Sequence, residues 1–198
     1  TELFNSFSLS SITLDLSKWD TSNVKSMRKM FAYTKVKSLN ISTWKVGNVE
    51  NMENMFSSFH TDINISEWNV SKVKTMKGMF AYSKLHSLDI SKWNVSNVEN
   101  MEEMFTSSDI DINISEWNVS NVKTMQKMFA YSKKFNSDIS NWNVSNVENM
   151  DNMFLSSRFN QDITKWDVTN VKTMNNIFQF NQYMGDIKPE EYFEVLKK

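Results

Sequence analysis

The sequence contains no cysteine among its 198 residues, only one proline, three glycines and two histidines. The absence of cysteine excludes disulfide bonds and excludes zinc or redox sites built on thiolates. No run of about 18 apolar residues is present, so no transmembrane helix is expected. Charge is balanced, with 22 basic and 23 acidic side chains. A nucleic-acid-binding protein needs a basic stripe, and we therefore expect no nucleic-acid partner.

Signatures of catalysis and of cofactor binding are also missing. The two histidines, His60 and His86, lie in variable loops, where a solvated side chain is the simpler interpretation than a ligand or a base. The sequence has no Gly-x-Ser-x-Gly elbow to activate a serine. It also lacks a glycine-rich phosphate loop and a calcium-loop signature. We predict a protein that is not an enzyme and that uses no metal and no cofactor.

The most regular feature of the sequence is its tryptophan. The seven tryptophans follow one another at alternating steps of 25 and 24 residues, at Trp19, Trp44, Trp68, Trp93, Trp117, Trp142 and Trp166. A fixed period between roughly 20 and 50 residues is the signature of a solenoid, in which each repeat packs only against its neighbours. We therefore predict a single solenoid domain over residues 1–198, with a partial repeat at 1–15 and full repeats over 16–187.

Each repeat has two halves with different spacing. In Ile-x-x-Trp-x-Val, as at residues 114–119, Trp and Val are two residues apart, as on one face of a strand. In Val-x-x-Met-x-x-Met-Phe, as at residues 98–105, offsets of 3, 6 and 7 mark one stripe of a helix. The predicted fold class is therefore α/β: a right-handed, leucine-rich-repeat-like solenoid with one short strand and one short helix per coil of 24–25 residues. Trp, Val, Met and Phe should form its core.

The two ends depart from this pattern. Phe7 lies nine residues before Leu16, as Phe56 lies nine before Ile65, which predicts that Phe7 takes the Phe position of the partial repeat. Near the other end, Glu190 stands where Trp is expected, and Pro189 suits the first turn of a helix. We predict that residues 188–198 form a capping helix, because a terminal repeat must cover the open core.

Charge alternates from one coil to the next. The residue after the second valine is basic and acidic in turn, at Lys25, Glu50, Lys74, Glu99, Lys123, Glu148 and Lys172. Basic coils also carry a tyrosine two residues after Phe, whereas acidic coils continue with Ser or Thr. The structural unit is therefore a 49-residue pair of coils. Each exposed ion pair contributes only ~0.2–1 kcal/mol, but a slip by one coil would bring like charges together.

Two surfaces are candidate binding sites. If Trp and Val point inward, the residues on either side of Trp form a flat polar face, and the predicted binding surface consists of Thr43, Lys45, Glu67, Asn69, Lys92, Asn94, Glu116, Asn118, Asn141, Asn143, Lys165 and Asp167. The competing interpretation is an asparagine ladder that satisfies neighbouring coils. An alternative interface consists of Tyr33, Tyr82 and Tyr131, which could instead stack against the next helix.

The repeat resembles a known family. Residues 159–174, Phe-Asn-Gln-Asp-Ile-Thr-Lys-Trp-Asp-Val-Thr-Asn-Val-Lys-Thr-Met, closely resemble the repeat of about 25 residues found in mycoplasma surface lipoproteins and in wall-anchored proteins of Gram-positive bacteria. That repeat is similar to BspA-type leucine-rich repeats. The resemblance extends over about residues 3–187 and weakens at Gly47 and Lys72, where the Ser-Asn-Val motif is altered.

The resemblance implies a location and a role. It implies a non-catalytic module on the cell surface, outside the cell, for adhesion to or recognition of a protein or glycan on a host or neighbouring cell, or for antigenic display. Attachment to a membrane would depend on an anchor outside these residues. The alternative is a self-assembling structural surface protein held together by its alternating-charge coils, which would make the chain a homo-oligomer.

Overall fold

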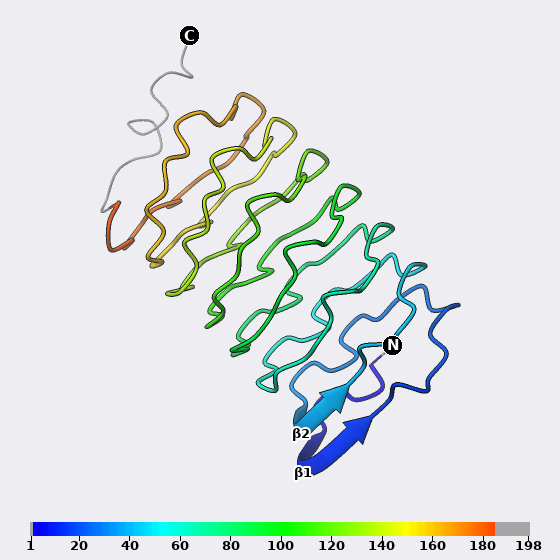
Figure 1. Cartoon of the computed structure of the whole chain (residues 1–198). Helices are drawn as coiled ribbons and strands as arrows, with labels where there is room; N and C mark the ends of the chain where they lie inside the picture. Colours follow the sequence, from blue (N-terminus) through cyan, green and yellow to red (C-terminus); the bar gives the residue numbers. More distant parts are fainter. Residues whose placement is uncertain (1, 185–198) are drawn as a thin grey trace.

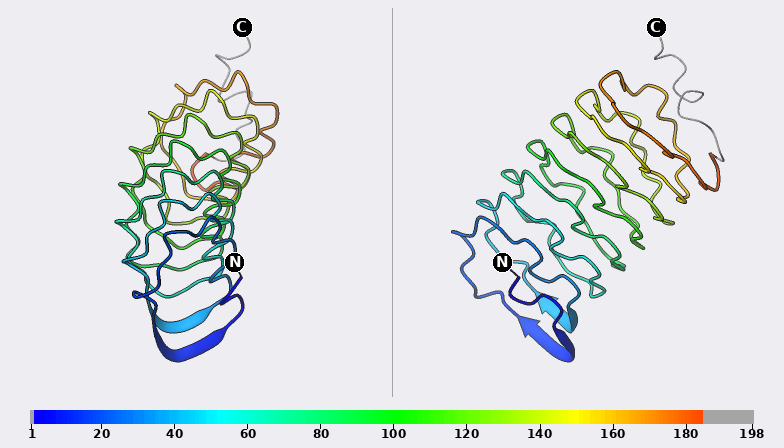
Figure 2. Two further views of the ribbon diagram at one scale, coloured as in Figure 1. Left: turned by 90° about the vertical axis from the view of Figure 1, so that its right-hand side faces the viewer. Right: turned by 180° about the vertical axis from the view of Figure 1, so that it is seen from behind.

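A computed structural model describes residues 2–184, which form one stack of coils along a single axis (Figure 1). The N-terminal strands lie at one end of the stack and the coil around residues 160–184 lies at the other, as both views of Figure 2 show. Successive coils are joined by backbone hydrogen bonds, such as Met27 N–H to Asn51 O at 2.8 Å. Each coil therefore contacts the coil that follows it in sequence.

The predicted composition of each coil is wrong. Residues 2–184 contain no helix, and their only named strands are β1 (Ser8–Asp15) and β2 (Lys35–Asn40), which pair in parallel. Elsewhere the parallel pairing is reduced to one bridging residue per coil, at Ser26, Asn51, Thr75, Asn100, Thr124, Asn149 and Thr173. The α/β solenoid with a strand and a helix in every repeat is thus overturned. The predicted capping helix at 188–198 lies outside the described residues.

The segment expected to be a helix is a run of tight turns. Met79 N–H donates to Met76 O at 3.0 Å within its own turn, but Phe80 N–H donates to Met104 O at 2.9 Å on the next coil. The same alternation continues at residues 81 and 82. A helix would instead direct every amide to the carbonyl four residues earlier. Half of the amides therefore close local turns, and the other half hold neighbouring coils together.

A left-handed residue at every fourth position creates this pattern. In each coil two residues have φ between 51° and 60°, and they are Lys29 and Tyr33, Asn54 and Ser58, Gly78 and Tyr82, Glu103 and Ser107, Lys127 and Tyr131, Asn152 and Ser156, and Asn176 and Phe180. Positive φ at the third residue is a feature of type II turns. The resulting four-residue cycle brings apolar side chains three and four residues apart to one side. A turn cycle and a helix therefore share the same apolar spacing.

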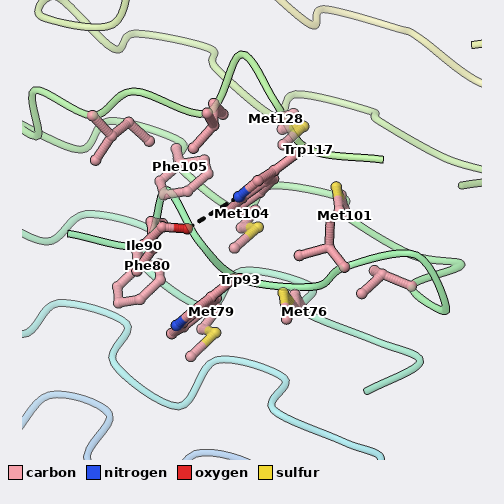
Figure 3. Close-up of a cluster of buried hydrophobic side chains, with 14 of the residues drawn as sticks. Met76, Met79, Phe80, Ile90, Trp93, Met101, Met104, Phe105, Trp117 and Met128 are labelled. Atoms are coloured by element: carbon pink, nitrogen blue, oxygen red, sulfur yellow. Dashed lines mark hydrogen bonds between the residues drawn. The ribbon is translucent and has the colours of Figure 1, made fainter. Parts of the chain in front are cut away.

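The core consists of columns of side chains that run along the stack. The rings of Phe80 and Phe105 stack with their centroids 5.7 Å apart and their planes 8° apart. Trp117 packs against Phe105 from within the same coil, and its indole N–H donates to Ile90 O of the preceding coil at 3.1 Å (Figure 3). The methionines of the central coils, such as Met101, are fully buried beside these rings, whereas Met30 and Met174 in the end coils are partly buried. The predicted core of Trp, Val, Met and Phe is confirmed.

The first coil differs from the prediction at its phenylalanine. Phe4, and not Phe7, stacks on Phe31, with the ring centroids 5.3 Å apart and the planes 4° apart. The register of β1 against β2 shifts between Leu9 and Thr13, which pair with Val36 and Ser38. Two extra residues in β1 thus lengthen the first coil, so that Phe4 lies twelve residues before Leu16, whereas Phe31 lies ten residues before Ile41. Phe7 is left 48 % exposed.

Candidate functional site

The predicted strand face is exposed along the whole stack. All twelve of its residues are exposed, whereas the residues between them are buried: Trp93 is 4 % exposed and Val95 is 1 % exposed. The backbone there is nevertheless a turn, because Trp93 N–H donates to Ile90 O at 3.1 Å. The alternation of inward and outward side chains is right, but the strand is wrong. We call these twelve residues the polar face.

The asparagines of the polar face hold their own turns. The Asn94 side-chain oxygen accepts hydrogen bonds from Ser96 N–H at 3.1 Å and from the Ser96 hydroxyl at 2.7 Å. Asn69, Asn118 and Asn143 each accept the amide two residues ahead at the same distance of 3.1 Å. These are Asx turns, which the short side chain of asparagine favours. The oxygens of this column therefore serve the fold within each coil.

A different asparagine column, which sequence reasoning missed, joins the coils. Asn97 Nδ2 donates to Ser71 O at 2.7 Å, and the equivalent amide of Asn121 donates to Ser96 O at 2.7 Å. Where Lys72 replaces the asparagine, its Nζ donates to Asn48 Oδ1 at 2.7 Å, so that the contact between coils is kept. The signal in the sequence is the second residue of Ser-Asn-Val, which recurs once per coil.

A second column of Asx turns lies just before the buried isoleucines. Its members accept the amide two residues ahead, and they are Asp15, Asn40, Asn64, Asp89, Asn113, Asp138 and Asp162 with the following Ser or Thr. The hydroxyl and amide of Ser91 lower the pKa of Asp89 below its ordinary value. Ser140 lowers the pKa of Asp138 by the same two bonds, of which the amide bond is the larger influence. The charged form of these carboxylates is favoured because it is the better acceptor.

Shallow polar hollows repeat with the pair of coils. One hollow of about 380 Å³ is lined by residues that include Asp111, Asn113 and Asp138. Its counterpart 49 residues earlier has about 420 Å³ and is lined by Asp62, Asn64 and Asp89. Within residues 2–184, no group of three or more His, Asp or Glu side chains is arranged to hold a metal ion.

The predicted charge alternation pairs neighbouring coils. Lys74 lies 3.7 Å from Glu50, and Lys77 lies 2.9 Å from Glu102. The hydrogen bond that Lys77 donates to the carboxylate of Glu102 raises the pKa of Lys77. The bond between Lys172 and Glu148, 2.5 Å long, lowers the pKa of that glutamate. All of these groups contact solvent, so each pair stabilises the stack only modestly.

The predicted tyrosine interface is half exposed. Tyr33, Tyr82 and Tyr131 have exposed fractions of 55 %, 50 % and 49 %. Each has a left-handed backbone, and each amide donates to the next coil, as Tyr82 N–H does to Thr106 O at 2.7 Å. No helix lies beside them in the part of the chain that the structure describes. The tyrosines therefore form a regular exposed row.

Comparisons with known proteins identify the chain at the level of family. No helix within residues 2–184 has the length and apolar character that crossing a membrane requires. No curated protein and no solved structure matches the chain. A family model described as "Mycoplasma protein of unknown function, DUF285" matches it twice, over residues 1–111 and 83–192. The chain, a bacterial repeat protein, belongs to this DUF285 family.

Proposed function

We propose that the chain is a non-catalytic recognition module of the bacterial cell surface. The polar face would bind a protein or glycan on a host or neighbouring cell, or display variable epitopes. The observation that carries this proposal is the exposure of all twelve residues of the polar face, in register along the coils. The resemblance of the repeat to bacterial surface-protein repeats supports the location.

The residue before each tryptophan is best suited to determine specificity. This position changes from Glu67 to Lys92 to Glu116 while the surrounding turns keep the same hydrogen bonds. The asparagines that follow Trp68, Trp93, Trp117 and Trp142 are instead used by their own turns. The backbone beneath the face is held by these turns and by the indole bonds of the core. A surface that is ordered before binding loses less conformational entropy when a partner docks.

The test replaces four residues that precede tryptophan. A variant with Glu67→Ser, Lys92→Ser, Glu116→Ser and Lys165→Ser keeps the net charge, since it removes two acids and two bases. Binding of the labelled protein to host cells and to neighbouring bacterial cells, measured by flow cytometry, should fall at least tenfold. The control variant carries Glu50→Ser, Lys74→Ser, Glu99→Ser and Lys123→Ser, away from the polar face. Equal binding by both variants would contradict the proposal.

Self-assembly is a second candidate, favoured by the alternation of basic and acidic coils. Within the stack Lys74 lies 3.7 Å from Glu50 and Lys77 lies 2.9 Å from Glu102, and the same alternation would pair coils of two chains. Light scattering should then show association that rises with concentration and weakens with salt. The variant with Glu50→Ser, Lys74→Ser, Glu99→Ser and Lys123→Ser should abolish it, and a monomer at every salt concentration would rule it out.

A further inference from the structure

An exposed aromatic row runs along the stack, two coils to each step. Its members are Tyr33, Tyr82, Tyr131 and Phe180, spaced 49 residues apart. Their exposed fractions lie between 49 % and 68 %, whereas the tryptophans from Trp44 to Trp166 and the stacked phenylalanines beside them are buried. Exposed aromatic side chains arranged in a line are characteristic of binding surfaces.

The backbone does not require an aromatic ring at these positions. All four residues have φ between 55° and 60°, a conformation that bulky side chains rarely adopt. The intervening coils have Ser58, Ser107 and Ser156 in the same conformation and with the same backbone hydrogen bonds to the next coil. These rings are not buried, their turns do not require them, and their backbone conformation is strained. We infer that they have a role other than stabilising the fold.

Positive charge accompanies the rings. Lys35, Lys84 and Lys133 follow the three tyrosines by two residues and are exposed. Arg158 takes the same position in an intervening coil. Asp109 is the acidic exception, and Lys134 neutralises it at 3.2 Å. We define the Tyr–Lys edge as Tyr33, Lys35, Tyr82, Lys84, Tyr131, Lys133, Arg158 and Phe180. Its charge fits an acidic partner.

The distance between successive tyrosines indicates which peptide conformation would fit the Tyr–Lys edge. Tyr82 N–H bonds to Thr106 O, and Ser107 N–H bonds to Ala130 O, both at 2.7 Å. Chains paired in this way lie ~4.8 Å apart, so the backbones of successive tyrosines repeat at about 9.6 Å. A polyproline II helix completes one turn of three residues in about 9.3 Å, which is close to this backbone period.

Other peptide conformations fit the period less well. Side chains on one face of an extended strand repeat at about 6.6 Å. Two turns of an α-helix span about 10.8 Å, which accumulates an error of about 3.6 Å along the row. A polyproline II segment also presents unpaired carbonyl groups. The tyrosine hydroxyls can donate hydrogen bonds to these carbonyls while the rings pack against proline.

We propose that the Tyr–Lys edge binds an acidic, proline-rich segment in the polyproline II conformation. One turn of the segment lies over each tyrosine, with proline on the ring and a carboxylate beside the following lysine. About half a coil separates Tyr33 from the polar face at Lys45 along the chain, and Trp44 and Phe31 meet in the core between the two walls. The edge and the polar face can therefore be inactivated separately.

The experiment uses a fluorescein-labelled peptide of four Pro-Pro-Glu repeats, which spans about 37 Å. Fluorescence anisotropy should show saturable binding by the full chain. The variant with Tyr33→Ser, Tyr82→Ser and Tyr131→Ser should bind at least tenfold more weakly, and its unfolding midpoint should stay close to that of the original protein. Serine is suited to this test because the intervening coils already use it there.

Two controls separate charge from conformation. Replacement of Lys35, Lys84 and Lys133 by glutamine should weaken binding and flatten its salt dependence. The same change at Lys45, Lys92 and Lys165, on the polar face, should leave the affinity unchanged. A flexible peptide of four Gly-Ser-Glu repeats should bind at least tenfold more weakly than the proline peptide.

Three results would overturn the proposal. They are unchanged affinity of the tyrosine variant, equal affinity for the flexible peptide, and failure of the proline peptide to bind. Heparin is included as a probe, and binding of heparin without binding of the proline peptide would assign the edge to an acidic glycan. The polar-face variant tested against cells does not alter the Tyr–Lys edge. Failure of one proposal therefore leaves the other intact.

Discussion

Trp19 and Trp93 occupy the same place in their coils, yet 43 % of Trp19 is exposed and only 4 % of Trp93. Trp93 lies against the preceding coil, whose Ile65 carbonyl accepts its indole N–H at 3.1 Å. Trp19 belongs to the first coil, beside Phe4 and the irregular strand β1. The comparison teaches that a coil does not bury its own core residues. Burial is completed by the neighbour, as expected when stability resides in interfaces between repeats.

The largest difference between the two regions should come from phenylalanine. Phe105 is 1 % exposed and stacks on rings of both neighbouring coils. Phe105→Ala should lower the free energy of unfolding by ~3–5 kcal/mol, because it leaves a cavity inside the column. Phe7→Ala, at a half-exposed ring, should cost less than about 1 kcal/mol. Urea unfolding followed by circular dichroism measures both. Equal losses would show that the first coil is packed as tightly as the centre.

A smaller difference should come from the indole hydrogen bond. Trp93→Phe keeps a ring but removes one of the two hydrogen bonds to the Ile65 carbonyl, which still accepts Trp68 N–H at 3.1 Å. The expected cost is that of one lost hydrogen bond, ~0.5–1.5 kcal/mol. Trp19→Phe, at an exposed ring, should change the free energy of unfolding by less than about 0.5 kcal/mol. The same unfolding measurement applies. If Trp93→Phe and Trp19→Phe change the free energy of unfolding equally, the indole hydrogen bond contributes little, and the two sites differ only in burial.

The smallest effect should be the same in both regions, because it is local to each coil. Hydrogen bonds from Ser17 and Ser91 lower the pKa of Asp15 and Asp89. The stability that these carboxylates contribute is present above the unfolded pKa of about 3.9 and is lost as the pH falls through the folded value. Asp15→Asn and Asp89→Asn should therefore reduce the loss of thermal stability on acidification from pH 5 to pH 2 equally. The matched reference is Asn64, which already fills this position.

A marked difference between those two variants would contradict the local interpretation of the Asx turns. It would show that contacts between coils, such as the one between Asp15 and Asn40, outweigh the hydrogen bonds within each turn. Thermal unfolding at several pH values, at constant ionic strength, distinguishes these outcomes.

The period, the core and the pairing of charges could be predicted from the sequence. Each depends only on which residues recur and on the fact that neighbouring coils meet. The regular spacing of the apolar residues Trp, Val, Met and Phe indicated that they form the core, and in the central coils they do. Lys74 and Glu50 alternate in sign, and stacking alone brings them together. The polar face followed in the same way from the alternation around tryptophan.

The secondary structure could not be predicted from apolar spacing, since a helix and a four-residue turn cycle place the same side chains inward. Backbone torsion distinguishes them, and the sequence held a hint of it. The position before Met-Phe contains Asn54, Gly78 and Asn152, all with positive φ. Asparagine and glycine are poor inside helices and favourable in the left-handed region. Lys29 and Glu103 occupy the same position in other coils, and because both residue types favour helices they made this pattern harder to recognise.

The place of Phe4 could not be predicted either. Phe4 stacks on Phe31 because β1 contains two extra residues. A repeat pattern in the sequence does not show where such an irregularity in strand pairing occurs. The left-handed backbone and the exposure of the tyrosines could not be predicted either. Both depend on the turns, whereas the apolar spacing predicted a helix.

The alternation of basic and acidic coils affects how the number of repeats can change during evolution. Duplication or loss of a 49-residue segment by recombination would join a basic coil to an acidic one at the new junction. The same event over a single coil would place two coils of like charge, such as those of Lys25 and Lys74, in direct contact. The protein can therefore gain or lose pairs of coils during evolution while every interface between coils still joins a basic coil to an acidic one. The length of the stack then changes by two coils at a time.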